Sequence, residues 1–134
     1  MPTLYISVKP NANNGINKIL LSNPLRSQKM KLLTAVINKQ GAGYNQSKVH
    51  IRIPFLSSNQ FNSGEKTGYL TLSTAKGTKG IEVIPFGSGL DLPCDHVSEV
   101  FECQLLDENS QGITNNTHFT SVDLYFSYET SSLF

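Results

Sequence analysis

Two neighbouring acids, Asp107 and Glu108, come closest to a catalytic pair by type and spacing. Paired carboxylates can perform glycoside hydrolysis, and they bind Ca²⁺ when backbone carbonyls complete the coordination shell. Here they lie in the stretch Leu-Asp-Glu-Asn-Ser-Gln-Gly, residues 106–112, whose composition is typical of an exposed turn. We therefore interpret both acids as turn residues and as candidates for binding in a loop, with no catalytic role.

The histidines and cysteines form no recognisable site. His50, His96 and His118 are far apart, and none lies at metal-ligand spacing from another His or Cys. Cys94 and Cys103 match no zinc motif; we expect Cys103 to be a buried free thiol, with a Cys94–Cys103 disulfide as the open alternative. The nucleophile-elbow, P-loop and dinucleotide-binding motifs are also absent from the sequence. We expect no enzyme activity, no metal and no cofactor.

The aromatic residues are the remaining candidates for binding chemistry. The chain has five tyrosines and seven phenylalanines but no Trp, and most of the phenylalanines lie where a core is expected. We therefore interpret the aromatic set mainly as core. Tyr44 and Tyr69 are kept, with Asp107 and Glu108, as candidates for binding a sugar, a base or another ligand through the loops.

Eight segments are predicted to form the strands that position these side chains. They are separated by stretches rich in Gly, Asn and Ser, and no helical segment alternates with them, which favours a sandwich or barrel. The segments are residues 3–8, 16–21, 29–39, 49–55, 68–72, 81–86, 97–106 and 120–128. Pro85 cannot donate a ladder hydrogen bond, so the sixth strand should end there or lie at a sheet edge.

The apolar pattern is clear at the end of the chain and ambiguous near residue 30. Residues 120–128 alternate with period two, as expected of a strand with one buried face. Lys29–Lys39 also fits a helical stripe; we predict a strand and leave the helix open. As a strand this segment is apolar on both faces, which implies a contact beyond the domain's own core. Leu33, Ala35 and Ile37 are therefore predicted to lie in an interface.

Length and charge limit the remaining possibilities. The 134 residues have the size of one domain, 1–134, and no apolar run is long enough to cross a bilayer. From residues 1–9 we expect no secretory signal. All 11 basic residues and one acid lie in residues 1–81, net +10, whereas the other nine acids lie in residues 82–134, net −9. The basic residues are scattered singly, which argues against a nucleic-acid partner. We expect the opposite charges to meet within the domain or between copies of it.

Two stretches resemble the capsid jelly rolls of virophages and polinton-like viruses. The first is Ile-Leu-Leu-Ser-Asn-Pro-Leu at residues 19–25, followed by Lys-Leu-Leu-Thr-Ala-Val-Ile-Asn at residues 31–38. It looks like an early strand, a Pro-containing connection and a strand that ends in Asn. The second runs from Val-Phe-Glu-Cys-Gln-Leu-Leu-Asp-Glu-Asn at residues 100–109 through Gly112 to Val-Asp-Leu-Tyr-Phe at residues 122–126. It looks like a penultimate strand, an Asp-Glu-Asn turn and a final aromatic strand.

The resemblance implies an all-β, eight-stranded antiparallel jelly-roll sandwich. The chain has room for one jelly roll, whereas the family's major capsid proteins carry two. A minor capsid component of the virion is therefore implied, such as a penton, cement or cap protein, assembling as a trimer or pentamer and with other capsid proteins. The alternative is a lectin-like module on the same fold, which binds a host glycan or receptor through its loops.

Overall fold

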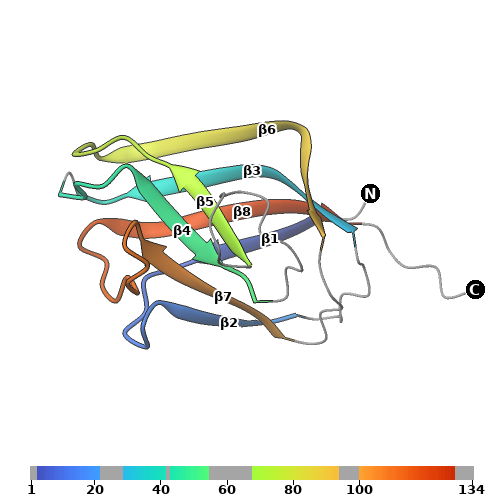
Figure 1. Cartoon of the computed structure of the whole chain (residues 1–134), viewed down its shortest axis with the longest axis horizontal. Helices are drawn as coiled ribbons and strands as arrows, with labels where there is room; N and C mark the ends of the chain where they lie inside the picture. Colours follow the sequence, from blue (N-terminus) through green and yellow to red (C-terminus); the bar gives the residue numbers. More distant parts are fainter. Residues whose placement is uncertain (1–2, 22–28, 42, 55–67, 94–99, 129–134) are drawn as a thin grey trace, which may run out of the picture.

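In a computed structural model, the chain forms a β-sandwich of two four-stranded antiparallel sheets (Figure 1). The structure describes residues 3–21, 29–41, 43–54, 68–93 and 100–128. None of these residues is helical, so the described part of the chain contains no helix able to span a membrane. The strands are β1 (Thr3–Val8), β2 (Ile16–Leu20), β3 (Lys29–Lys39), β4 (Lys48–Arg52), β5 (Tyr69–Ser73), β6 (Gly80–Pro93), β7 (Val100–Asp107) and β8 (Phe119–Tyr128). The predicted all-β class is confirmed, and Lys29–Lys39 is a strand.

The strand order shows how the chain is wound. One sheet, called sheet A here, has the order β1-β8-β3-β6, and the other, sheet B, has the order β2-β7-β4-β5. The pairs β1-β8, β2-β7, β3-β6 and β4-β5 are nested, so each strand of the first half lies beside a strand of the second half. The chain is thus wound as nested antiparallel pairs that are shared between the two sheets.

The core lies between the inward faces of the two sheets. On β8, Val122, Leu124 and Phe126 point inward and are fully buried, which confirms the alternation predicted for this segment. Phe101 on β7 reaches across from sheet B, and its ring centroid lies 5.9 Å from that of Phe126. Burying each such side chain stabilises the fold by about 1.5–3 kcal/mol, so these contacts hold the two sheets together.

A bulge in β3 changes which residues face the core. The register of β3 against both of its neighbours shifts between Leu32 and Thr34, and against β8 Leu33 is the extra residue. Beyond the bulge the alternation is reversed, and Ala35 and Ile37 point inward with 0% of their surface exposed. The interface prediction is therefore wrong for Ala35 and Ile37, because both are core residues. Leu33 is half-buried, and its role in an interface stays a prediction.

The long strand β6 forms one edge of sheet A, as Pro85 predicted. It does not end near residue 86, however, but continues to Pro93. On β6, Pro85 pairs with Thr34 and Leu90 pairs with Leu32. Residues 86–89 of β6 therefore lie opposite the bulge. Gly87 and Gly89 in this stretch have φ angles of 60° and 114°, a left-handed conformation that glycine adopts with little strain.

The nesting also explains the uneven distribution of charge. Because β3 belongs to the basic half and β6 to the acidic half, their side chains meet across the ladder. Lys31 lies opposite Asp91 with 4.0 Å between Nζ and Oδ1, and Lys39 forms an ion pair with Glu82 at 2.5 Å. The expectation that opposite charges meet within the domain is confirmed for these two pairs.

Candidate functional site

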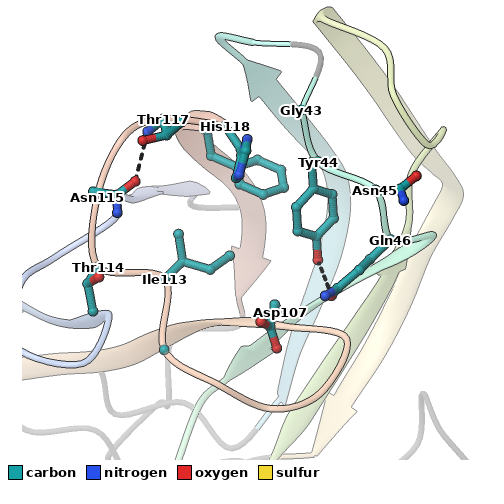
Figure 2. A pocket seen from close by; sticks show the side chains of 12 residues that line it. Gly43, Tyr44, Asn45, Gln46, Asp107, Ile113, Thr114, Asn115, Thr117 and His118 are labelled. Carbon is teal, nitrogen blue, oxygen red and sulfur yellow. Dashed lines mark hydrogen bonds between the residues drawn. The ribbon is translucent and has the colours of Figure 1, made fainter.

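A pocket of about 520 Å³ opens at one end of the sandwich (Figure 2). It lies between the β3–β4 connection and the β7–β8 connection, at the left end of the molecule in Figure 1. Its lining comes from residues 43–46, Asp107, residues 112–115 and residues 117–119. The volume falls within the range of about 300–1,000 Å³ that is usual for small-molecule sites.

The structure brings together two of the four loop-binding candidates. Tyr44 and Asp107 both line the pocket, although they come from different connections. Glu108 lies beside the pocket without lining it. Tyr69 is on β5, outside the lining, and its ring packs T-shaped with that of His50 at a centroid distance of 5.9 Å. The pocket is therefore a site for Tyr44 and Asp107, and Tyr69 does not belong to it.

Glu108 joins the two connections that frame the pocket. Its backbone N–H donates a hydrogen bond to Gln46 Oε1 at 2.7 Å. Its carboxylate oxygen Oε1 accepts a hydrogen bond from Ser47 Oγ at 2.9 Å. These bonds fix residues 46–47 against the end of β7, so Glu108 positions the wall of the pocket.

Tyr44 is a buried wall residue. Its hydroxyl donates to the Lys48 carbonyl oxygen at 2.5 Å and contacts Gln46 Oε1 at 3.2 Å. Its ring meets Phe119 edge-on, with a centroid distance of 4.6 Å. Burial is the largest cause, and the negative charge of Asp107 the second, of a phenol pKa well above its usual value. The hydroxyl therefore remains a hydrogen-bond donor. Tyr44 is thus held in one position in the wall of the pocket.

Asp107 and Asn115 carry hydrogen-bonding atoms that the protein leaves available. Asp107 Oδ1 accepts the N–H groups of Asn109 at 2.9 Å and Gln111 at 3.0 Å, which stabilises the turn after β7. Asn115 Oδ1 accepts the N–H of Thr117 at 3.1 Å. Within the described ranges no hydrogen bond is made by Asp107 Oδ2 or Asn115 Nδ2. One carboxylate acceptor and one amide donor are therefore free for a ligand.

His118 is a functional candidate that the sequence did not reveal. Its Nδ1 is buried, and no hydrogen-bond partner for it lies among the residues that the structure describes. Gly43 lies against the ring, since a Cβ at that position would be 2.8 Å from Cε1 and 3.1 Å from Nδ1. An unsatisfied buried polar atom costs about 1–3 kcal/mol, which makes this wall of the pocket unusual. No spacing signal predicts it, because Gly43 and His118 meet only in the folded chain.

The structure places no reactive thiol or metal cluster in the parts of the chain it covers. No group of three or more His, Cys, Asp or Glu side chains there could hold a metal ion. Cys103 is a buried free thiol, as expected. Its burial is the main cause, and the charge of Glu102 a smaller one, that raises its pKa to about 12. The nucleophilic thiolate is therefore disfavoured at neutral pH. Cys94 and its predicted disulfide alternative lie outside the described residues.

A second candidate site is the outward surface of sheet A. Four large apolar side chains there are between 41% and 70% exposed. They are Tyr5, Tyr125, Ile81 and Val83, which we call the apolar outer face. Tyr5 lies opposite Tyr125 in the ladder, with 5.0 Å between ring centroids. On sheet B the exposed apolar residues of the described chain are a single cross-strand pair, Leu20 and Val100.

Comparison of the chain with protein-family models, curated proteins and solved structures gives no match. The strand order, the pocket and the apolar outer face are therefore the observations from which we infer function.

Proposed function

We propose that this protein is a virion structural protein, a minor capsid component of the penton, cement or cap type. It associates with copies of itself and with other capsid proteins. The strand order that we interpret as a single jelly roll supports this proposal, together with the resemblance of residues 19–38 and 100–126 to capsid jelly rolls. The observation that carries it is the apolar outer face of sheet A.

The members of the apolar outer face lie on three strands of the sheet, with the polar Asn38 and Asp123 between them. Val36 on β3 joins its members, because it lies opposite Val83 on β6 and diagonal to Tyr125 on β8. The inward faces of the same strands already form a closed core, in which Ile37 and Leu124 are fully buried. The outer side chains are therefore not needed to fill the core. Several large exposed apolar side chains on one face of a sheet favour an interaction site there.

The polar groups on this face favour association because they are paired within the sheet. Asp123 Oδ1 accepts a hydrogen bond from Ser7 Oγ at 2.7 Å. Asp123 Oδ2 accepts one from Asn38 Nδ2 at 3.1 Å, and the same amide also donates to Ser121 Oγ at 3.0 Å. Covering a carboxylate whose oxygens are already hydrogen-bonded costs less than covering an unpaired one. A partner that covers this face then gains apolar burial at about 25 cal/mol per Å².

The oligomeric state of the purified chain tests the proposal. Sedimentation velocity over a range of concentrations should give one discrete oligomer, and electron microscopy should show whether it is three-fold or five-fold. A five-fold ring indicates a vertex protein, and a trimer indicates a cap or cement protein. A chain that stays monomeric at high concentration and does not associate with capsid proteins would contradict the proposal.

A further inference from the structure

We propose that the pocket between the β3–β4 and β7–β8 connections binds a neutral carbohydrate. The site lies at the end of the sandwich, apart from the apolar outer face, so this inference does not depend on the assembly proposed above. It rests on the hydrogen-bonding atoms of the lining, its charge, and the way in which the two connections are held.

The free hydrogen-bonding atoms match the hydroxyl groups of a sugar. Within the described chain Asp107 Oδ2 is an unoccupied acceptor, and Asn115 Nδ2 is an unoccupied donor. Sugar hydroxyls both donate and accept, so a carboxylate and an amide that line one pocket can bind different hydroxyls of a carbohydrate. A hydrogen bond from a hydroxyl to a carboxylate is charge-assisted and among the stronger neutral-ligand contacts.

The pocket also has an apolar wall for the C–H groups of a sugar ring. In Figure 2, Ile113, His118 and Tyr44 lie around the same space. Ile113 and His118 are half-buried, so part of each side chain reaches the pocket surface. Most of the exposed lining is polar, which suits a ligand rich in hydroxyl groups, and these three side chains supply its apolar part.

Charge distinguishes a neutral sugar from other ligands. Among the described lining residues there is no Lys or Arg, and Asp107 is the one acid, followed in the chain by Glu108. A phosphate, a sulfated sugar or a sialylated glycan would meet this negative charge without a compensating cation. A metal ion would need more ligands, because the described residues contain no cluster of three acidic, His or Cys side chains.

The pocket is organised before a ligand arrives. Gln46 Oε1 accepts hydrogen bonds from the Glu108 N–H and from the Tyr44 hydroxyl. The bond from Glu108 joins the β3–β4 connection to the β7–β8 connection. The Gln40 N–H donates to the His118 carbonyl oxygen at 2.9 Å, which holds the start of β8. Walls fixed in this way lose little conformational freedom on binding, which favours affinity even from few contacts.

Binding of the full chain to an array of glycans tests the inference. The array should carry neutral glycans ending in galactose, mannose, glucose or N-acetylglucosamine, beside sialylated and sulfated ones. The strongest neutral glycan is then titrated by calorimetry and by NMR. We expect it to bind, with amide shifts confined to residues 43–46 and 107–119.

Two variants and a matched control locate the site. Asp107→Asn keeps the Oδ1 acceptor for the turn but replaces Oδ2 with a donor, and it should weaken binding about tenfold or more. Gly43→Ala should also weaken binding, because the added Cβ displaces the His118 ring. Asp91→Asn, an exposed carboxylate on β6 outside the pocket, should leave the affinity unchanged.

Three results would overturn the inference. The first is that no neutral glycan binds. The second is that the sialylated or sulfated glycans bind in preference to the neutral ones. The third is that a neutral glycan binds wild type and Asp107→Asn with equal affinity. None of these results bears on the oligomeric state, so each is distinguishable from a failure of the assembly proposal.

Discussion

Lys39 Nζ lies 2.5 Å from Glu82 Oε1, with the Lys39 side chain fully buried and the Glu82 side chain 28% exposed. The same ammonium donates to the Ala75 carbonyl oxygen at 2.5 Å and to Thr78 Oγ1 at 2.8 Å. All three of its protons therefore have partners. Because residues 74–79 lead from β5 in sheet B to β6 in sheet A, this one side chain ties the crossing between the sheets to β3.

Lys39→Met should destabilise the protein by about 2–4 kcal/mol. The substitution keeps the length of the side chain but leaves the Glu82 carboxylate and the Ala75 carbonyl oxygen without their donor, and breaking a buried pair is costly. Urea unfolding measures the free energy of unfolding. Lys31→Met is the control, because its pair with Asp91 is exposed and loose at 4.0 Å; it should change stability by less than about 0.5 kcal/mol. Equal losses in the two variants would contradict this role for Lys39.

Acid should remove part of the stability through Glu82. Burial raises the pKa of this carboxyl, but hydrogen bonds from Lys39, Thr74 and the Ala75 N–H, with the charge of Lys39, lower it overall below 4.5. A group whose folded pKa is depressed adds stability above its unfolded pKa, and that stability is lost as the pH falls through the folded pKa. Thermal unfolding from neutral pH into the acid range should show a steeper loss below 4.5 for wild type than for Glu82→Gln. Parallel curves would show that Glu82 does not contribute.

Gly15 and Gly87 should respond differently to the same substitution. Both have left-handed φ angles, 76° and 60°, so Ala costs about 1–2 kcal/mol in strain at either position. At Gly15 the added Cβ would also collide with the Leu105 carbonyl oxygen, whereas at Gly87 it would meet no atom of the described residues within 4 Å. Urea unfolding should therefore show a loss at least about 1 kcal/mol larger for Gly15→Ala than for Gly87→Ala. Equal losses would mean that the close approach to Leu105 is absent.

Cys103 should be unreactive until the protein unfolds. Its thiol is buried, which limits the access of a reagent to the sulfur, and burial raises its pKa to about 12. Little reactive thiolate is therefore present at neutral pH. In a Cys94→Ser background, Cys103 is the single remaining cysteine. A thiol-reactive disulfide reagent at mildly alkaline pH should label it negligibly in buffer and fully in concentrated urea. Rapid labelling of the native protein would contradict its place in the core.

Local periodicity predicted the strands well because each strand has one buried face. Alternation in β8 and β1 can be read directly from neighbouring residues, and even the ambiguous β3 was predicted with its correct bounds. The bulge at Leu33 could not be predicted, since an extra residue in one strand is visible only against its partners. That single residue moved Ala35 and Ile37 from a predicted interface into the core.

The candidate site was only partly predictable for a related reason. Tyr44 and Asp107 were singled out by residue type and loop context, but nothing in the sequence placed them in one pocket. Their proximity follows from the nesting of early strands with late ones. His118 was missed because its unpaired Nδ1 and its contact with Gly43 exist only after folding. The apolar outer face likewise needs the ladder register before Tyr5, Val36 and Val83 can be placed on one surface.

Sedimentation of two matched lysine variants tests most directly whether the apolar outer face drives self-association. Val83→Lys places a charge on that face, and Val100→Lys makes the same change on the outward surface of sheet B. Both valines are exposed, so neither variant disturbs the core. We expect a discrete oligomer for wild type and Val100→Lys, and dissociation to monomer for Val83→Lys. A monomeric wild type, or a Val83→Lys variant that assembles as tightly as wild type, would contradict it.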